Sequence, residues 1–111
     1  IMKLSINEQY KLLEAQKQRK RTLKEIGFTR ILNEIGITSE STVFKEIEIT
    51  EEKQGELKKI FEDKYKEWHE NPSKEILSEC VGILEALNFI GMNMSVSELF
   101  AKADWCNRIS D

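Results

Sequence analysis

The sequence is poor both in residues that interrupt helices and in residues that build metal or catalytic sites. Its 111 residues include one proline, five glycines, two cysteines and one histidine. So few helix breakers leave long stretches free to be helical. Cys80 and Cys106 are too few and too far apart for a zinc cluster, which takes about four ligands at short spacings. We therefore expect two buried, reduced thiols, no bound metal and no cofactor.

Signatures of catalysis are missing as well. His69 is the single histidine, so no second imidazole can share a metal with it. The chain contains no glycine-rich phosphate loop and no Gly-Xaa-Ser-Xaa-Gly nucleophile motif. Acidic pairs such as Glu51-Glu52 are common on exposed helix faces and do not indicate acid–base chemistry by themselves. We expect a protein that is not an enzyme, with His69 solvated at a helix end.

Long apolar runs are also absent, which bears on the cellular location of the protein. No stretch approaches the roughly 18–20 apolar residues of a membrane span. Residues 1–5 do not have the charged-then-apolar pattern of a signal peptide, so we expect a cytoplasmic protein without a membrane partner. The chain is 40% hydrophobic and 33% charged, which favours one folded domain over residues 1–111.

Start and stop signals for helices predict an all-α fold, a compact bundle of four to five helices. Ser5 and Glu8 have the spacing of a capping box, which starts a long N-terminal helix. Ile6, Tyr10 and Leu13 form its apolar face, and apolar spacing resumes at residues 23–26 after a polar interval.

The middle of the chain is harder to assign. Thr29 can cap a short helix over residues 30–35, and Gly36 reads as its stop. Residues 37–49 fit either a short helix or a strand with Ile47 and Ile49 on one face. We favour the helix, because a lone strand has no evident partner elsewhere in the sequence.

The second half of the sequence has the clearest helical pattern. Thr50 starts a helix with an apolar stripe over residues 57–68, and Asn71-Pro72 ends it. Ser73 then starts the central helix of the bundle, near residues 74–90. That helix is apolar around most of its circumference, apart from a narrow polar strip of Ser78, Gly82 and Glu85. We expect the stripe at 57–68, a last helix capped by Ser95 and part of the first helix to cover it. An uncovered flank would be a place for a second subunit or a partner.

Charge is unevenly distributed along the chain. Residues 1–30 carry eight bases and three acids, whereas the remaining residues carry nine bases and seventeen acids. The basic residues gather in one segment, which gives the candidate binding residues for a partner protein or a nucleic acid: Lys17, Arg19, Lys20, Arg21 and Lys24. On a continuous helix, all of these except Arg19 would share one face. The alternative is a solvated face, or one that pairs with acidic helices of the same chain.

Residues 31–47 partly resemble a helix-turn-helix DNA-binding unit. Ile31, Ile35 and Gly36 match an apolar first helix and its turn, and Thr38 would cap the second helix. The sequence departs from the pattern at Leu32, where a small residue is preferred. Glu40 and Glu46 would also bring negative charge toward DNA. The resemblance implies a divergent DNA-binding unit at 31–47.

Two hypotheses about function follow. The favoured one is a small regulatory or inhibitory binding protein that acts through protein–protein contact, of a size and Lys/Glu/Ile-rich composition that suit a phage or mobile-element regulator. The alternative is a nucleic-acid-binding regulator that uses the basic face between Lys17 and Lys24. A homodimer is compatible with either.

Overall fold

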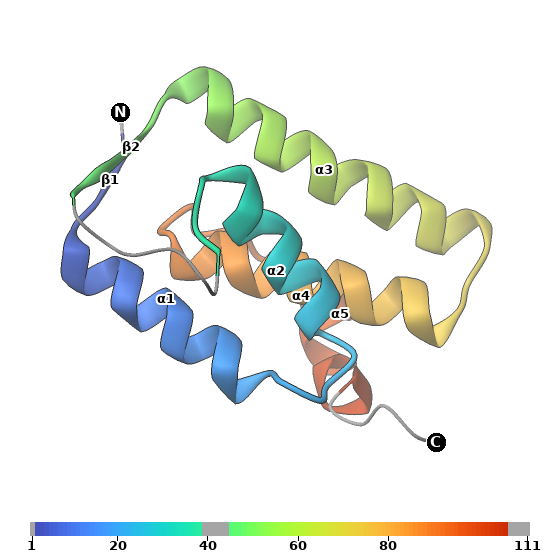
Figure 1. The fold of residues 1–111 in the computed structure, drawn as a ribbon. Coiled ribbons are helices and arrows are strands. Elements are labelled where there is room, and N and C mark those ends of the chain that lie inside the picture. Colours follow the sequence, from blue (N-terminus) through green and yellow to red (C-terminus); the bar gives the residue numbers. More distant parts are fainter. Residues whose placement is uncertain (1, 39–44, 107–111) are drawn as a thin grey trace.

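The computed structural model describes residues 2–38 and 45–106 (Figure 1). Most of these residues are helical, and the expected all-α bundle is confirmed. The elements in chain order are β1 (Met2–Leu4), α1 (Ile6–Gln18), α2 (Glu25–Glu34), β2 (Ile47–Ile49), α3 (Glu51–Glu70), α4 (Lys74–Phe89), α5 (Ser97–Ala101) and the 3-10 helix η1 (Ala103–Cys106).

Side-chain caps fix three of the helix starts where the sequence predicts them. Ser5 and Glu8 form a reciprocal capping box at the start of α1, with the Ser5 N–H donating to Glu8 Oε1 at 3.1 Å. The hydroxyls of Thr50 and Ser73 accept backbone N–H bonds at the starts of α3 and α4. Gly91, at φ 99°, ends α4.

The last helix begins differently from its prediction. Its N-cap is Val96 rather than Ser95, and no side chain caps it. Asn88 Oδ1 accepts the Met94 N–H at 2.6 Å and Asn93 adopts φ 51°, so the chain turns just before this point. The helix is short and gives way to η1.

Residues 47–49 form a strand, and the helix favoured for residues 37–49 is wrong at its C-terminal end. β2 pairs with β1 in an antiparallel register that joins Met2 to Ile49 and Leu4 to Ile47. The missing partner strand was therefore the first few residues of the chain. Residues 39–44 of this prediction lie outside the described residues.

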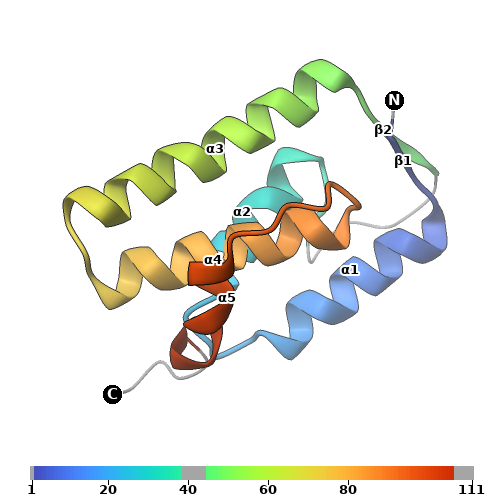
Figure 2. The same ribbon diagram turned by 180° about the vertical axis from the view of Figure 1, so that it is seen from behind.

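α4 is the centre of the molecule, as its apolar sequence predicts. Figures 1 and 2 show α2 crossing it on one side and the C-terminal segment running across the other, with α3 and α1 flanking the pair. The polar strip of α4 is not exposed, since Ser78 and Gly82 are both buried and Gly82 lies against the backbone of Lys24 and Phe28 at the start of α2. α2, which the sequence did not assign to this role, makes the largest contact with α4.

Two glycines permit the close crossing of α2 and α4. A Cβ atom added to Gly27 would lie 2.1 Å from the Glu79 carbonyl oxygen, and one added to Gly82 would lie 2.1 Å from the Lys24 carbonyl oxygen. Neither position can hold a side chain at this separation. The backbones therefore touch directly, and Phe28 beside them is completely buried.

α1 packs through a face other than the expected one. Its buried residues are Gln9, Leu12 and Ala15, whereas Ile6 and Tyr10 are exposed. Gln9 tolerates burial because its Nε2 donates to the carbonyl oxygens that flank the small sheet, at 3.1 Å to Leu4 and 2.8 Å to Lys45. This side chain fixes the rotation of α1 and leaves the Ile6–Tyr10 side facing outward.

Candidate functional site

The basic segment forms a turn and not the predicted continuous helix. α1 ends at Gln18 because the polar residues that follow have nothing to bury, and the Thr22 hydroxyl donates to the Arg19 carbonyl oxygen at 2.6 Å. Arg21 adopts φ 70°, in the left-handed region that non-glycine residues seldom occupy. The expected shared helical face of Lys17, Lys20, Arg21 and Lys24 therefore does not exist.

Arg19 and Lys24 point into the molecule and meet the same carboxylate of α4. Arg19 Nε lies 2.9 Å from Glu85 Oε1, and Lys24 Nζ lies 3.3 Å from Glu85 Oε2. The three side chains are between 11% and 16% exposed, so this cluster is largely shielded from water. These two cations hold the turn against the bundle. They match the expectation that part of the basic segment pairs with acids of its own chain.

Arg19 is also enclosed by aromatic rings. Its guanidinium carbon lies 4.6 Å from the ring centre of Phe28 and 5.1 Å from that of Phe89. A second bond runs from its Nη1 to the Ala15 carbonyl oxygen at 2.9 Å. The guanidinium of Arg19 thus contacts two aromatic rings and hydrogen-bonds to a carboxylate and a carbonyl oxygen inside the protein, which leaves little of it for a ligand.

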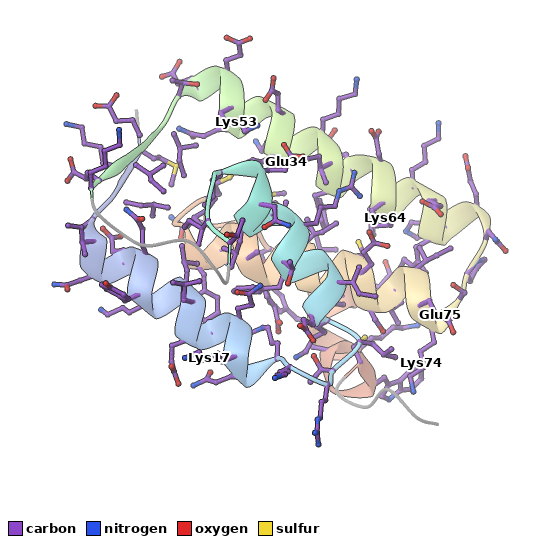
Figure 3. The ribbon with its side chains drawn as sticks, viewed as in Figure 1. Lys17, Glu34, Lys53, Lys64, Lys74 and Glu75 are labelled. Carbon is purple, nitrogen blue, oxygen red and sulfur yellow. The ribbon has the colours of Figure 1, made fainter. Side chains whose placement is uncertain are left out.

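The other three candidates form a patch that we call the basic turn: Lys17, Lys20 and Arg21. Each is exposed, and none forms an ion pair with another residue that the structure describes. Figure 3 shows Lys17 at the C-terminal end of α1, on the side of the molecule away from α3. Some other lysines do meet acids, as Lys53 on α3 does with Glu34 on α2 at 3.1 Å. The basic turn therefore carries positive charge that the described fold leaves without a partner.

An exposed tryptophan lies near this turn, and sequence reasoning missed it. The Leu23 N–H donates to the Cys106 carbonyl oxygen at 3.2 Å, which joins the end of η1 to the segment between α1 and α2. Figures 1 and 2 both show these two segments side by side. Trp105, next to Cys106, is 66% exposed, and Lys102 Nζ lies 5.6 Å from its ring centre. The available signal was that Trp105 falls outside the apolar spacing of Ala103 and Cys106.

The residues weighed for chemistry occupy ordinary structural positions. His69 lies in the last turn of α3, half exposed, with its ring against Tyr65 and Trp68 and Nε2 3.9 Å from Glu98 Oε2. Cys80 and Cys106 are free and buried, as predicted. Burial raises the pKa of the Cys80 thiol to about 12, so it stays protonated and unreactive at neutral pH.

The helix-turn-helix resemblance fits only its first half. Ile31 lies within α2, and Gly36 makes the expected turn at φ 92°. The second helix would end at 47, but Lys45 and Glu46 are not helical and Ile47 belongs to β2. Residues 39–44, where the rest of that helix would fall, lie outside the described residues.

Two further observations concern other kinds of site. No helix within the described ranges, 2–38 and 45–106, combines the length and apolar character needed to cross a bilayer. In the same ranges, no three histidine, cysteine or acidic side chains gather as metal ligands would. No family model matches the chain, and neither a curated protein nor a solved structure shows significant similarity to it.

Proposed function

We propose that this chain is a small regulatory or inhibitory binding protein, without enzymatic activity, whose basic turn contacts an acidic surface on another protein. The observation that carries the proposal is the pair of exposed features at one corner. Lys17, Lys20 and Arg21 are exposed without an ion partner among the described residues, and the segment that carries the exposed Trp105 is hydrogen-bonded to Leu23, two residues after Arg21.

The composition of this corner suits a protein interface. Tryptophan and arginine are among the residues most enriched at positions that dominate binding energy, since tryptophan buries a large rigid ring and arginine offers several hydrogen-bond donors to carboxylates. Exposed cations of one sign speed encounter with an acidic partner and fix its orientation. Arg21 also holds a left-handed φ of 70°, a conformation that costs on the order of 1 kcal/mol and that tends to occur at functional sites.

The free, buried state of both cysteines fits a reducing compartment, which supports our proposal that the protein acts in the cytoplasm. The binding of this chain to an acidic protein surface should weaken as salt is raised, because salt screens the exposed cations of the basic turn.

The test is affinity capture from the native host with three forms of the chain. The test variant is Lys20→Glu/Arg21→Glu, and its matched control is Lys58→Glu/Lys59→Glu, which makes the same charge change on exposed residues of α3. We expect the wild type and the control to recover the same protein and the test variant to lose it. Equal recovery by all three forms, with unchanged circular dichroism, would refute the proposal.

A nucleic acid is the second candidate, because an exposed indole beside cations also suits a strand whose bases stack on aromatic rings. The footprint of the basic turn is small and the chain is acidic overall, with a net charge of −3. The affinity for duplex and single-stranded oligonucleotides should then fall as salt is raised. A plot of the logarithm of the binding constant against the logarithm of the salt concentration should have a slope of about −0.7 to −0.9 per phosphate contacted. Binding that survives Lys17→Ala/Lys20→Ala/Arg21→Ala, or that ignores salt, would exclude this candidate.

A further inference from the structure

The outward face of α1 carries apolar side chains that nothing in the described part of the molecule covers. Ile6 is 40% exposed and Tyr10 is 54% exposed. Leu13 is half-buried on the same side, and the row continues to the exposed Lys17. The spacings along this row are four, three and four residues, the pattern by which two helices pack side by side. We call these four residues the α1 stripe.

The α1 stripe is symmetric about its midpoint. Ile6 and Tyr10 are four residues apart, as are Leu13 and Lys17, so the halves have equal lengths of about 6 Å at 1.5 Å per residue. Two copies of α1 packed antiparallel would place Tyr10 on Leu13 and Ile6 on Lys17, twice, around a two-fold axis. This is the geometry of an isologous interface, in which one patch meets an identical patch.

The charges at the two ends of the α1 stripe are complementary. At the N-terminal end, a shallow hollow is lined by Ser5, Ile6, Asn7 and Glu46. At the other end stands Lys17. Neither Glu46 nor Lys17 forms an ion pair with another described residue. In the antiparallel arrangement each lysine reaches the hollow of the opposite copy, with its aliphatic stem along Ile6 and its ammonium group near Glu46.

We propose that the α1 stripe is the docking surface for a second copy of this chain, paired antiparallel with Lys17 of each copy seated beside Glu46 of the other. This inference goes beyond the proposed function and does not rest on it, because it needs no foreign partner. Lys17 belongs to both surfaces, so in the dimer Lys20 and Arg21 are the cations left for a foreign protein. One helix face is smaller than the roughly 800 Å² that each partner contributes to a standard interface. The dimer should therefore be reversible, forming between micromolar and submillimolar concentration.

The experiment is sedimentation velocity of the full chain across that concentration range. The wild type should convert from monomer to dimer. Tyr10→Glu, which places a charge at the centre of the contact, should remain monomeric throughout. Lys17→Glu and Glu46→Lys should each weaken self-association at least tenfold, since each puts like charges together, and the combined Lys17→Glu/Glu46→Lys swap should restore it to within about threefold of wild type.

Lys11→Glu is the matched control, because it makes the same charge change on the same helix but away from the α1 stripe. It should leave the dimerisation constant unchanged. The proposal is overturned if the wild type stays monomeric over the whole range, if Tyr10→Glu self-associates like the wild type, or if the charge swap remains as weak as its single variants. Circular dichroism accompanies each variant, and the charge swap decides alone if Tyr10→Glu loses helix content. Loss of partner capture through Lys20 and Arg21 would not alter any of these results.

Discussion

Replacing Gly82 with alanine tests whether the crossing of α2 and α4 determines the stability of this fold. The new methyl group would lie 2.1 Å from the Lys24 carbonyl oxygen and 3.0 Å from the Phe28 backbone nitrogen. An unstrained contact needs more than about 3 Å, so the helices must separate by about 1 Å. A gap of that size forfeits a quarter to a half of the dispersion attraction along the contact, where Phe28, Ile31 and Leu32 are completely buried.

The expected net effect follows from two opposing contributions. Forcing extra volume into a packed crossing costs about 1–3 kcal/mol and occasionally more. Alanine is the better helix former by about 1 kcal/mol, which offsets part of that cost. The atoms that the new methyl group meets are backbone atoms of Lys24 and Phe28, which cannot rotate away. We therefore expect a packing cost at the upper end of that range, about 3 kcal/mol, and a net loss of stability of about 2 kcal/mol. At about 4 °C per kcal/mol this lowers the Tm by about 8 °C.

Gly55→Ala is the matched control for this measurement. Gly55 lies within α3, and a Cβ atom added there would meet nothing within 4 Å, so the same substitution should raise stability by about 1 kcal/mol. Gly27→Ala should behave like Gly82→Ala, and the double variant should lose less than the sum, because one separation of the helices relieves both clashes. Urea unfolding followed by circular dichroism measures all four. If Gly82→Ala is as stable as the wild type while Gly55→Ala gains, the close crossing is not what holds α2 in place.

Three further predictions follow from the charges and thiols. Glu85→Ala should lower the unfolding free energy by about 2–3 kcal/mol, because it strands two shielded cations, whereas Glu75→Ala at an exposed position of the same helix should cost less than about 0.5 kcal/mol in a denaturant titration. Arg21→Gly should keep or raise the Tm, since glycine relieves the left-handed φ, while it weakens partner capture; a Tm drop of several degrees would show that Arg21 serves the fold instead. Cys80 and Cys106 should not react with a chromogenic disulfide reagent at pH 8 in the folded protein, and both should react fully in guanidinium. The reason is that both thiols are buried and that the pKa of Cys80 is raised to about 12. Rapid labelling of the folded protein would contradict this.

The basic segment illustrates how far spacing alone can predict a site. A sequence pattern identifies which residues are cationic, but it assumes that the helix continues. Here α1 ends at Gln18, and Glu85 of α4, distant in sequence, draws Arg19 and Lys24 inward. The candidate site therefore divides into a structural half and an exposed half. Only the three-dimensional position of the Glu85 carboxylate decides which cations belong to the structural half and which to the exposed half.

What the sequence by itself determined is local. Caps at Ser5, Thr50 and Ser73 and the apolar character of residues 74–90 depend on neighbours a few positions away, and these predictions are confirmed. The tertiary structure alone decided the long-range pairings. Residues 47–49 became a strand because the first residues of the chain supply a partner. The buried Gln9 turned the apolar row of α1 outward by donating to the nearby Leu4 carbonyl oxygen and the distant Lys45 carbonyl oxygen. The polar strip of α4 faces α2 because two glycines let the backbones touch, a complementarity that exists only when both helices are in place.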